Sequence, residues 1–339
     1  MGLWQYIARR LALAVLILVI VSIATFLLAH AVPGDPIDAI IGQRQGDNPA
    51  LRAALEHRWG LDKPLPLQYV YYVWNMFHGD LGTSLVTQDP VASDLRTYVP
   101  GTMELAFAAM CYALLVGIPL GIVAALRQDR WPDNVSRFFA LIGTSVPVFW
   151  LGLIFLYVFF YKLRWLPGPG RLDVGLTPPP RVTGMVTVDS LIAGNWADFF
   201  SVVKHIIMPA ICLGSYAMGI IARMLRSSLV AAMGDDYVRT ARAKGVKEAN
   251  VVVGHALRNA LIPTVTIIGL TFASLLAGAV LTETIFSWPG IGRYAVQAAE
   301  GLDYPALLGV TLIVAVAYVT VNLIVDIIYG VLDPRIRVG

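Results

Sequence analysis

Six apolar stretches separated by polar segments make up most of the chain. They occupy residues 11–33, 105–126, 138–160, 206–222, 260–282 and 305–325, and none of them contains Asp, Glu, Lys or Arg. Each comes close to the roughly 20 residues that a helix needs to cross about 30 Å of hydrocarbon. We therefore expect six transmembrane helices and an all-α integral membrane protein.

The composition agrees with a lipid-embedded chain. Hydrophobic residues make up 57% of the 339 residues, against about 45–50% in soluble domains, and the mean hydropathy is +0.69. Charged residues reach only 14%, too few to cover a water-soluble fold of this size. The net charge of +3 is too small to indicate a nucleic-acid partner. Both cysteines lie in apolar runs, which excludes a disulfide framework, and the spacing of the five histidines does not indicate a metal site.

The Lys and Arg residues indicate the orientation of the spans. If the N-terminus is cytoplasmic, the inside segments are 1–10, 127–137, 223–259 and 326–339, and they hold fourteen of the 25 Lys and Arg residues. The outside segments hold the rest over nearly twice the length. Because cytoplasmic loops carry an excess of Lys and Arg, we expect both termini in the cytoplasm.

We divide the chain into an N-terminal transmembrane helix (1–33), an extracytoplasmic helical region (34–104) and a five-helix core (105–339). In the second part, Asn48-Pro49 and Pro66 are typical helix starts, and Gly60 and Gly79 are typical stops. These two helices either form a cap over the outer side of a pore or lie flat at the lipid headgroups. The segment between spans three and four begins with a Pro- and Gly-rich stretch, for which we expect irregular structure.

The longest cytoplasmic connection, 223–259, contains a short polar helix. An aspartate, Asp235 or Asp236, is a candidate N-cap, the basic residues Arg242 and Lys244 fall in the last turn, and Gly245 fits the position after it. The pattern therefore predicts a helix over 236–244, with Tyr237, Thr240, Ala241 and Lys244 on one face. A second helix is expected to begin near Ala249 and to continue into span five. By spacing alone, a solvated loop without a partner is the favoured interpretation.

This connection resembles the cytoplasmic signature loop of binding-protein-dependent ABC importer permeases. The family pattern is Glu-Ala-Ala, three residues, Gly, nine residues, then Ile-x-Leu-Pro. Here Arg239-Thr240-Ala241, Gly245 and His255-Ala256-Leu257-Arg258 keep that spacing, with the Glu, the first Ala, the Ile and the Pro replaced. Further similar segments occur in the same order along nearly the whole chain: Pro33-Gly34-Asp35-Pro36, Gly79-Asp80-Leu81-Gly82, Thr282 to Gly292, Asp303-Tyr304-Pro305 and Asp333 to Arg337. These segments resemble the peptide and nickel branch of this family. The length of the chain and its long insert after span three are most similar to the B-type permease subunits of dipeptide systems.

The resemblance implies a pore-forming permease of the type I ABC importer fold in a bacterial inner membrane, which translocates di- or oligopeptides by alternating access. Its implied partners are a second, homologous permease, two cytoplasmic ATPase subunits and a periplasmic substrate-binding protein. ATP and Mg would bind to the ATPase subunits, and this chain, which has no Gly-Lys pair of a P-loop, would bind no cofactor and would not be an enzyme itself. The implied ATPase-coupling residues are Asp236, Tyr237, Arg239, Thr240, Ala241, Arg242, Ala243, Lys244, Gly245, His255 and Leu257, with Tyr237, Ala241 and Gly245 as the contact core.

Several alternatives stay open. The substrate of a permease of this branch could also be a longer peptide, a glutathione-like peptide, a haem precursor or nickel, and no residue can be assigned to the pathway. A secondary transporter would need ionisable residues inside its spans, and the six runs have none. An intramembrane enzyme would need a base beside Thr144, Ser145, Ser215 or Ser274. Glu283, Asp303 and Asp326 flank spans. Such residues usually mark the span ends, and the alternative is that they bind the amino terminus of a peptide or a proton.

Overall fold

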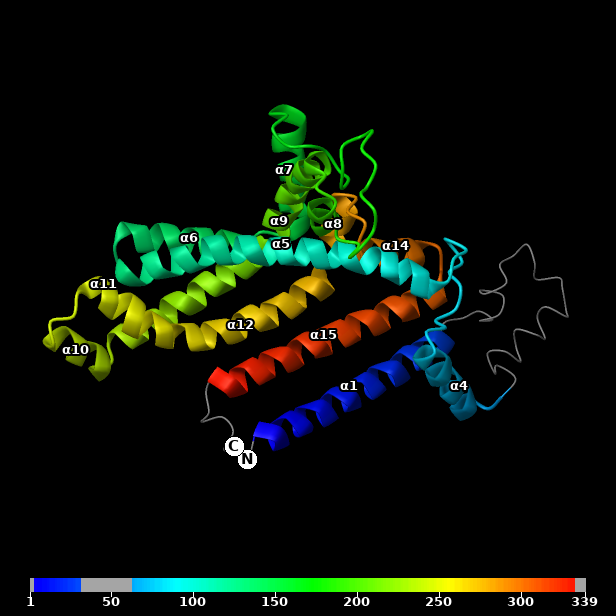
Figure 1. Cartoon of the computed structure of the whole chain (residues 1–339), viewed down its shortest axis with the longest axis horizontal. Helices are drawn as coiled ribbons and strands as arrows, with labels where there is room; N and C mark the ends of the chain where they lie inside the picture. The colour runs from blue at the N-terminus through cyan, green and yellow to red at the C-terminus, as the bar shows by residue number, and fades with distance from the viewer. Residues whose placement is uncertain (1–2, 32–62, 333–339) are drawn as a thin grey trace.

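The computed structural model of the chain describes residues 3–31 and 63–332 (Figure 1). Within these residues the fold is helical and contains no strand; Thr83 and Pro90 form an isolated antiparallel bridge. The helices, in order, are α1 (Leu3–Ala31), α4 (Leu65–Phe77), α5 (Val91–Leu126), α6 (Trp131–Ser145), α7 (Val148–Phe155), the π-helical η1 (Leu156–Lys162), α8 (Val186–Ile192), α9 (Trp196–Met233), α10 (Asp236–Ala243), α11 (Glu248–Asn250), the π-helical η2 (Val251–Ala256), α12 (Leu257–Gly278), α13 (Val280–Ile285), α14 (Ile291–Glu300) and α15 (Tyr304–Leu332).

Five of the described helical segments are long and apolar enough to cross a membrane: α1, α5, α9, α11–η2–α12 and α15. The third predicted span is not one straight helix. Its two parts, α6 and α7–η1, meet at an angle of 102°, and six spans result when this bent pair counts as one. The break falls at Val146-Pro147, where Val146 takes an extended conformation. Proline has no N–H to donate and disfavours a helical residue before it.

Helix α9 is much longer than the predicted fourth span, 206–222. It begins at Trp196, where the Asn195 side chain accepts the Asp198 backbone N–H at 3.3 Å, and it continues to Met233. An apolar run marks only the part of a helix that lies in hydrocarbon, so the polar turns at both ends escaped the prediction. Helix α9 is also the most deeply enclosed span, with 78% of its apolar window buried.

Small residues bring α9 close to its neighbours, as the glycines of the spans predicted. A Cβ on Gly214 would lie 2.5 Å from the Ala109 carbonyl oxygen of α5. A Cβ on Gly143 of α6 would lie 2.4 Å from the Ser215 carbonyl oxygen of α9. No side chain fits at these points, so the backbones of α5, α6 and α9 are in direct contact.

Helix α4 agrees with the second helix predicted in the outer region, with proline in its first turn and Gly79 at φ +76° just beyond its end. It rests on α1 through Tyr69, whose hydroxyl lies 2.8 Å from Ser22 Oγ and whose ring meets Phe26 edge-on. The helix predicted after Asn48-Pro49 lies outside the described residues. The choice between a cap and headgroup helices therefore stays a prediction.

The two ends of the bundle differ. The N-terminal end of α1, the C-terminal end of α15 and the α10–α11 pair all lie toward one end of the long axis, and α4 and α14 lie at the other (Figure 1). We name the first the coupling end, after the coupling residues predicted in α10, and the second the outer end, after the segments predicted to lie outside.

Candidate coupling site

Helix α10 forms over Asp236–Ala243 with Lys244 as its C-cap, so the predicted helix is confirmed. Gly245 has φ +76°, and the N–H groups of Gly245 and Val246 return to the carbonyls of Arg242 and Ala241. This left-handed stop is the ending expected of a glycine at that position. The N-cap residue is Asp235, but its side chain makes no capping hydrogen bond. The start of the helix is thus less tightly fixed than its end.

The two faces of α10 have different neighbours. Val238 and Ala241 are buried in an apolar cluster with Leu225 and Leu229 of α9 and Val251 of η2. Ala241, predicted as part of the contact core, therefore faces the rest of the chain, and its methyl group holds α10 against α9 and η2. The opposite face is exposed and carries Tyr237, Arg239, Thr240, Arg242, Ala243 and Lys244.

An ion pair joins α10 to the next helix. Arg242 Nη2 lies 2.7 Å from Glu248 Oε1, and Arg242 Nε donates to Glu248 Oε2 at 3.1 Å. This hydrogen bonding raises the pKa of Arg242. From Glu248 the chain runs through η2 into α12 without interruption, as predicted. His255 is exposed on η2, and Leu257 packs against the same apolar cluster as Ala241.

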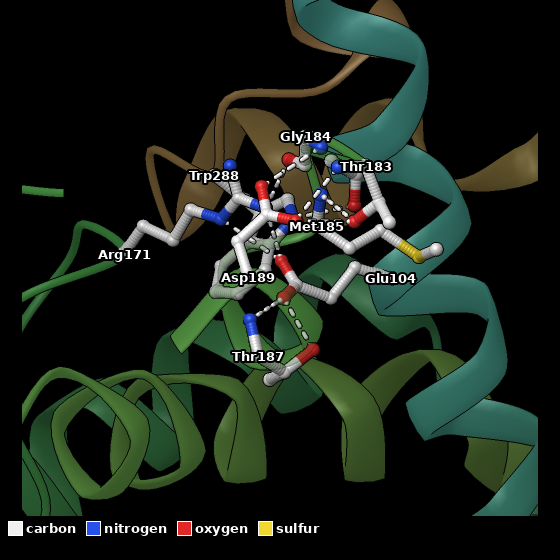
Figure 2. Close-up of polar contacts among 9 residues, drawn as sticks. Glu104, Arg171, Thr183, Gly184, Met185, Thr187, Asp189 and Trp288 are labelled. Carbon is white, nitrogen blue, oxygen red and sulfur yellow. Dashed lines mark hydrogen bonds and ion pairs between the residues drawn. The ribbon is translucent and has the colours of Figure 1, made fainter. Parts of the chain in front are cut away.

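At the outer end, Glu104 and Arg171 together connect α5, the insert, α8 and the loop of Trp288 (Figure 2). The Glu104 carboxylate is 3% exposed and pairs with Arg171. Arg171 lies in the irregular insert between η1 and α8, and its Nε donates to Glu104 Oε2 at 2.9 Å. Glu104 Oε1 accepts the N–H and the hydroxyl of Thr187 on α8 at 2.6 and 2.7 Å. The Arg171 guanidinium also donates to the Gly184 carbonyl and lies 5.5 Å from the ring centroid of Trp288.

Asp189 of α8 fixes the end of the same insert by hydrogen bonds. It accepts the Thr183 N–H and hydroxyl, both at 2.7 Å, and the Gly184 N–H at 2.9 Å. Burial by itself raises the pKa of the Asp189 carboxyl, but these hydrogen bonds outweigh it and hold the pKa below its usual value. The insert is therefore a fixed part of the fold in spite of its proline-rich sequence.

Glu283 of α13 caps the N-terminus of α14. Its Oε2 accepts the N–H groups of Gly292 and Arg293 at 2.7 and 3.0 Å, and Oε1 accepts the Thr102 hydroxyl at 2.6 Å. Burial raises the pKa of Glu283, partly offset by these hydrogen bonds. Trp288, in the intervening loop, donates from Nε1 to the Gly101 carbonyl at 2.8 Å.

Among the described residues, no group of three or more His, Cys, Asp or Glu side chains could hold a metal ion.

Known proteins match the chain from end to end. The family of binding-protein-dependent transport system inner membrane components matches residues 117–338, and the N-terminal part of such membrane components matches residues 3–106. The chain belongs to this family. It is therefore a multi-pass inner-membrane permease subunit of an ABC transporter, which works with a substrate-binding protein and ATPase subunits and is not an enzyme itself. Family membership sets aside the secondary transporter and the intramembrane enzyme.

Three relatives of this permease are similar over nearly their whole length. The di/tripeptide transport system permease protein DppB of Pseudomonas aeruginosa (strain UCBPP-PA14) is 46% identical over 333 residues, 98% of this chain and 98% of that protein. The probable D,D-dipeptide transport system permease protein DdpB of Escherichia coli (strain K12) is 45% identical over 339 residues, 100% of this chain and 99% of that protein. The dipeptide transport system permease protein DppB of Escherichia coli (strain K12) is 43% identical over 335 residues, 98% of each chain.

In this permease, the acidic residues taken to mark span ends have further partners. Glu283 is buried as described, and Asp303 accepts the Ser84 hydroxyl at 2.5 Å and the Ala306 N–H at 3.1 Å. Asp326 pairs with Arg10 of α1 at 2.7 Å. Sequence reasoning missed the Glu104–Arg171 pair altogether, because no local pattern links residues 67 positions apart.

Proposed function

We propose that this permease forms a pore with a second, homologous permease subunit and imports dipeptides or other short peptides. The support for the substrate is that relatives named for dipeptide or di/tripeptide transport are 43–46% identical over 98–100% of this chain. Substrate-contacting residues are not assigned, since selectivity is shared with the second permease and the binding protein.

The observation that carries the coupling role is the exposed polar face of α10. Its opposite face is anchored through Val238 and Ala241, so a protein that binds the exposed face would displace α10 together with the adjoining end of α9. The proposed docking residues are Asp236, Tyr237, Arg239, Thr240, Arg242, Ala243, Lys244 and Gly245, with His255 at the edge.

The proposed mechanism is alternating access. ATP and Mg bind to two cytoplasmic ATPase subunits, whose closure moves α10 and with it α9 and α12, so that the pore opens to the outside. Shifting a two-state equilibrium from 1:99 to 99:1 takes about 5.5 kcal/mol of differential binding. A helix docked over several residues can supply this, whereas one exposed ion pair supplies about 0–1 kcal/mol. No cofactor is assigned to this chain.

The proposed topology places both termini and α10 in the cytoplasm. It rests on the surplus of Lys and Arg in those segments and on the coupling end shared by α10, the start of α1 and the end of α15. The exposed aromatic side chains of α6, Trp131, Phe138 and Phe139, are then available to lipid or to the second permease.

Uptake by whole cells tests the substrate. A strain that lacks this gene should lose uptake of a radiolabelled dipeptide and regain it with the intact chain, while uptake of labelled nickel should be unchanged. Loss of nickel uptake with normal dipeptide uptake would overturn the proposal in favour of a metal permease.

A Tyr237→Cys variant tests the docking. In inverted membrane vesicles that hold the complete transporter, a short cross-linker should join this residue to an ATPase subunit. A cysteine at Val174, in the outer insert and fully exposed, is the control and should not react with that subunit. Cross-linking from Val174 but not from Tyr237 would contradict the docking site.

A further inference from the structure

Two charged side chains join α6 to α9 near the coupling end. Asp133 lies in the first turn of α6 with its side chain fully buried, and Arg226 lies on α9 with its side chain 22% exposed. Arg226 Nε donates to Asp133 Oδ1 at 2.7 Å, and Nη2 donates to Oδ2 at 2.7 Å. A bidentate pair of this kind fixes orientation as well as distance.

The remaining partners of the carboxylate come from its own neighbourhood. Oδ2 accepts the Asp129 N–H at 2.9 Å, and Arg137 Nε lies 3.4 Å from Oδ1. The Arg137 side chain is 49% exposed, so water screens its attraction. Within the described residues, the Asp133–Arg226 bridge is the only ion pair between α6 and α9.

Small residues also bring the backbones of α6 and α9 close together. Gly143 meets the Ser215 carbonyl, and Gly219 meets the Ala140 carbonyl, where a Cβ would lie 2.5 Å from the oxygen. Such contacts hold two helices close but contain no directional bond along the helix axis. The bridge is therefore the feature that opposes sliding of α6 along α9.

The bridge also lies on the route from α10 to the outer end. Arg226 is about two turns before Met233, where α9 ends, and α10 begins at Asp236. At its other end α6 leads through the 102° bend into α7. Gly152 of α7 packs against Ile285 and Phe286, directly before the loop of Trp288. A displacement passed from α9 to α6 would thus reach the loops of the outer end.

We propose that Asp133 and Arg226 are positioning residues for transport, whose bridge makes α6 move together with α9 when α10 is displaced. The inference rests on the proposed function of α10. Without the bridge, α9 moves past α6 over the small residues, and ATP hydrolysis continues without moving α7. The expected defect is therefore a loss of peptide transported per ATP hydrolysed.

Single substitutions in the complete transporter, reconstituted in vesicles, give the first test. Asp133→Asn and Arg226→Gln should each lower peptide uptake per ATP hydrolysed by about tenfold, within the 5- to 150-fold range of typical coupling between sites. The ATPase subunits should still copurify with both variants. Arg137→Gln is the matched control, because it removes a cation from the same carboxylate and leaves the bridge; its ratio should stay at the wild-type value.

A double variant separates coupling from folding. Apolar residues often replace a buried ion pair without loss of stability, so Asp133→Leu with Arg226→Met should insert and assemble normally. The proposal expects uptake per ATP to stay low in this variant. A wild-type ratio would overturn it, since the bridge would then serve stability alone.

Chemical rescue tests the mechanical role directly. The background carries Cys111→Ala and Cys212→Ala, and the test variant adds Asp133→Cys and Arg226→Cys. Its uptake per ATP should be low, should recover when a bifunctional maleimide joins the two cysteines, and should not recover with N-ethylmaleimide. If uptake per ATP stays low in protein whose two cysteines have been cross-linked, the proposal is contradicted.

The docking role of α10 and the positioning role of the bridge can fail separately. If Tyr237→Cys fails to cross-link to an ATPase subunit, the docking role of α10 fails. If that cross-link forms while the Asp133 and Arg226 variants keep the wild-type ratio, only the positioning role fails.

Discussion

At the residue scale, the end of α10 depends on the backbone of Gly245. Its φ of +76° lies in the left-handed region, which costs an L-residue with a Cβ about 1–2 kcal/mol. A Cβ built on Gly245 meets no atom within 4 Å. Within this chain, the effect of a substitution here therefore comes from the backbone and not from a clash of the Cβ atom.

This distinction yields a prediction for Gly245→Val and Gly245→Asn. Valine should destabilise the end of α10 by about 1–2 kcal/mol, displace Lys244 and Thr240 from the docking face, and lower uptake relative to ATP hydrolysis. Asparagine tolerates the left-handed region and should retain most uptake. Initial uptake and hydrolysis rates in vesicles measure both. Equal uptake by the two variants would refute the backbone explanation.

Individual residues differ in how far the sequence could predict them. Gly245 was predictable, because a helix stop of this kind depends on a few neighbouring residues. The inward side of Ala241 was not: α10 has small or apolar residues on both faces, and burial depends on where Leu225 and Leu229 of α9 lie. The partner of Arg171 was equally hidden, since tertiary packing alone brings it to Glu104.

At the element scale, the link between α13 and α14 depends on one buried carboxylate. Glu283 accepts two N–H groups of α14 and the Thr102 hydroxyl, while Gly290 leaves room for it: a Cβ there would lie 2.2 Å from the Glu283 carboxyl carbon. The acid and the glycine therefore form one structural unit.

We predict that Glu283→Ala is strongly destabilising, because it leaves three donors without an acceptor at about 1–3 kcal/mol each. Glu283→Gln should cost much less, since its oxygen can still accept both N–H groups while its amide faces Thr102. Gly290→Ala should resemble Glu283→Ala by displacing the carboxylate. Thermal unfolding of the purified transporter in detergent measures the order of the three. If Glu283→Gln lowers the unfolding temperature as much as Glu283→Ala does, the negative charge stabilises this link and the hydrogen-bond geometry does not.

The bend in the third span shows why element geometry was only partly predictable. Pro100, Pro119, Pro209 and Pro263 each lie inside an unbroken helix, whereas Pro147 separates two helices at 102°. Neighbouring groups decide whether a membrane helix continues past a proline. The sequence therefore identified six apolar segments correctly but not the path of the third.

At the scale of the whole molecule, α9 occupies the centre and joins the two ends. It is enclosed by α5, α6 and α12 and leads into α10 at the coupling end. Asp198 and His205 near its start are buried, and Ser201 between them accepts the Asp173 N–H of the insert at 2.9 Å. Because most of α9 is packed against other helices of the chain, a displacement of α9 is passed directly to its neighbours. Under the proposed topology, the coupling end and the outer end of the bundle lie on opposite sides of the membrane.

The two-ended arrangement predicts which positions react from outside the cell. In a background with Cys111→Ala and Cys212→Ala, a cysteine at Val174 should react with a membrane-impermeant maleimide in intact spheroplasts, because the proposed topology places the outer insert in the periplasm. A cysteine at Ala243, exposed on α10, should react only after the membrane is opened. Both positions are accessible to solvent, so only the side of the membrane distinguishes them. Labelling of Ala243→Cys in sealed spheroplasts would place α10 outside the cell and remove the basis for its docking to a cytoplasmic ATPase. Labelling of Val174→Cys alone would place α10 on the side of the membrane where ATP is hydrolysed.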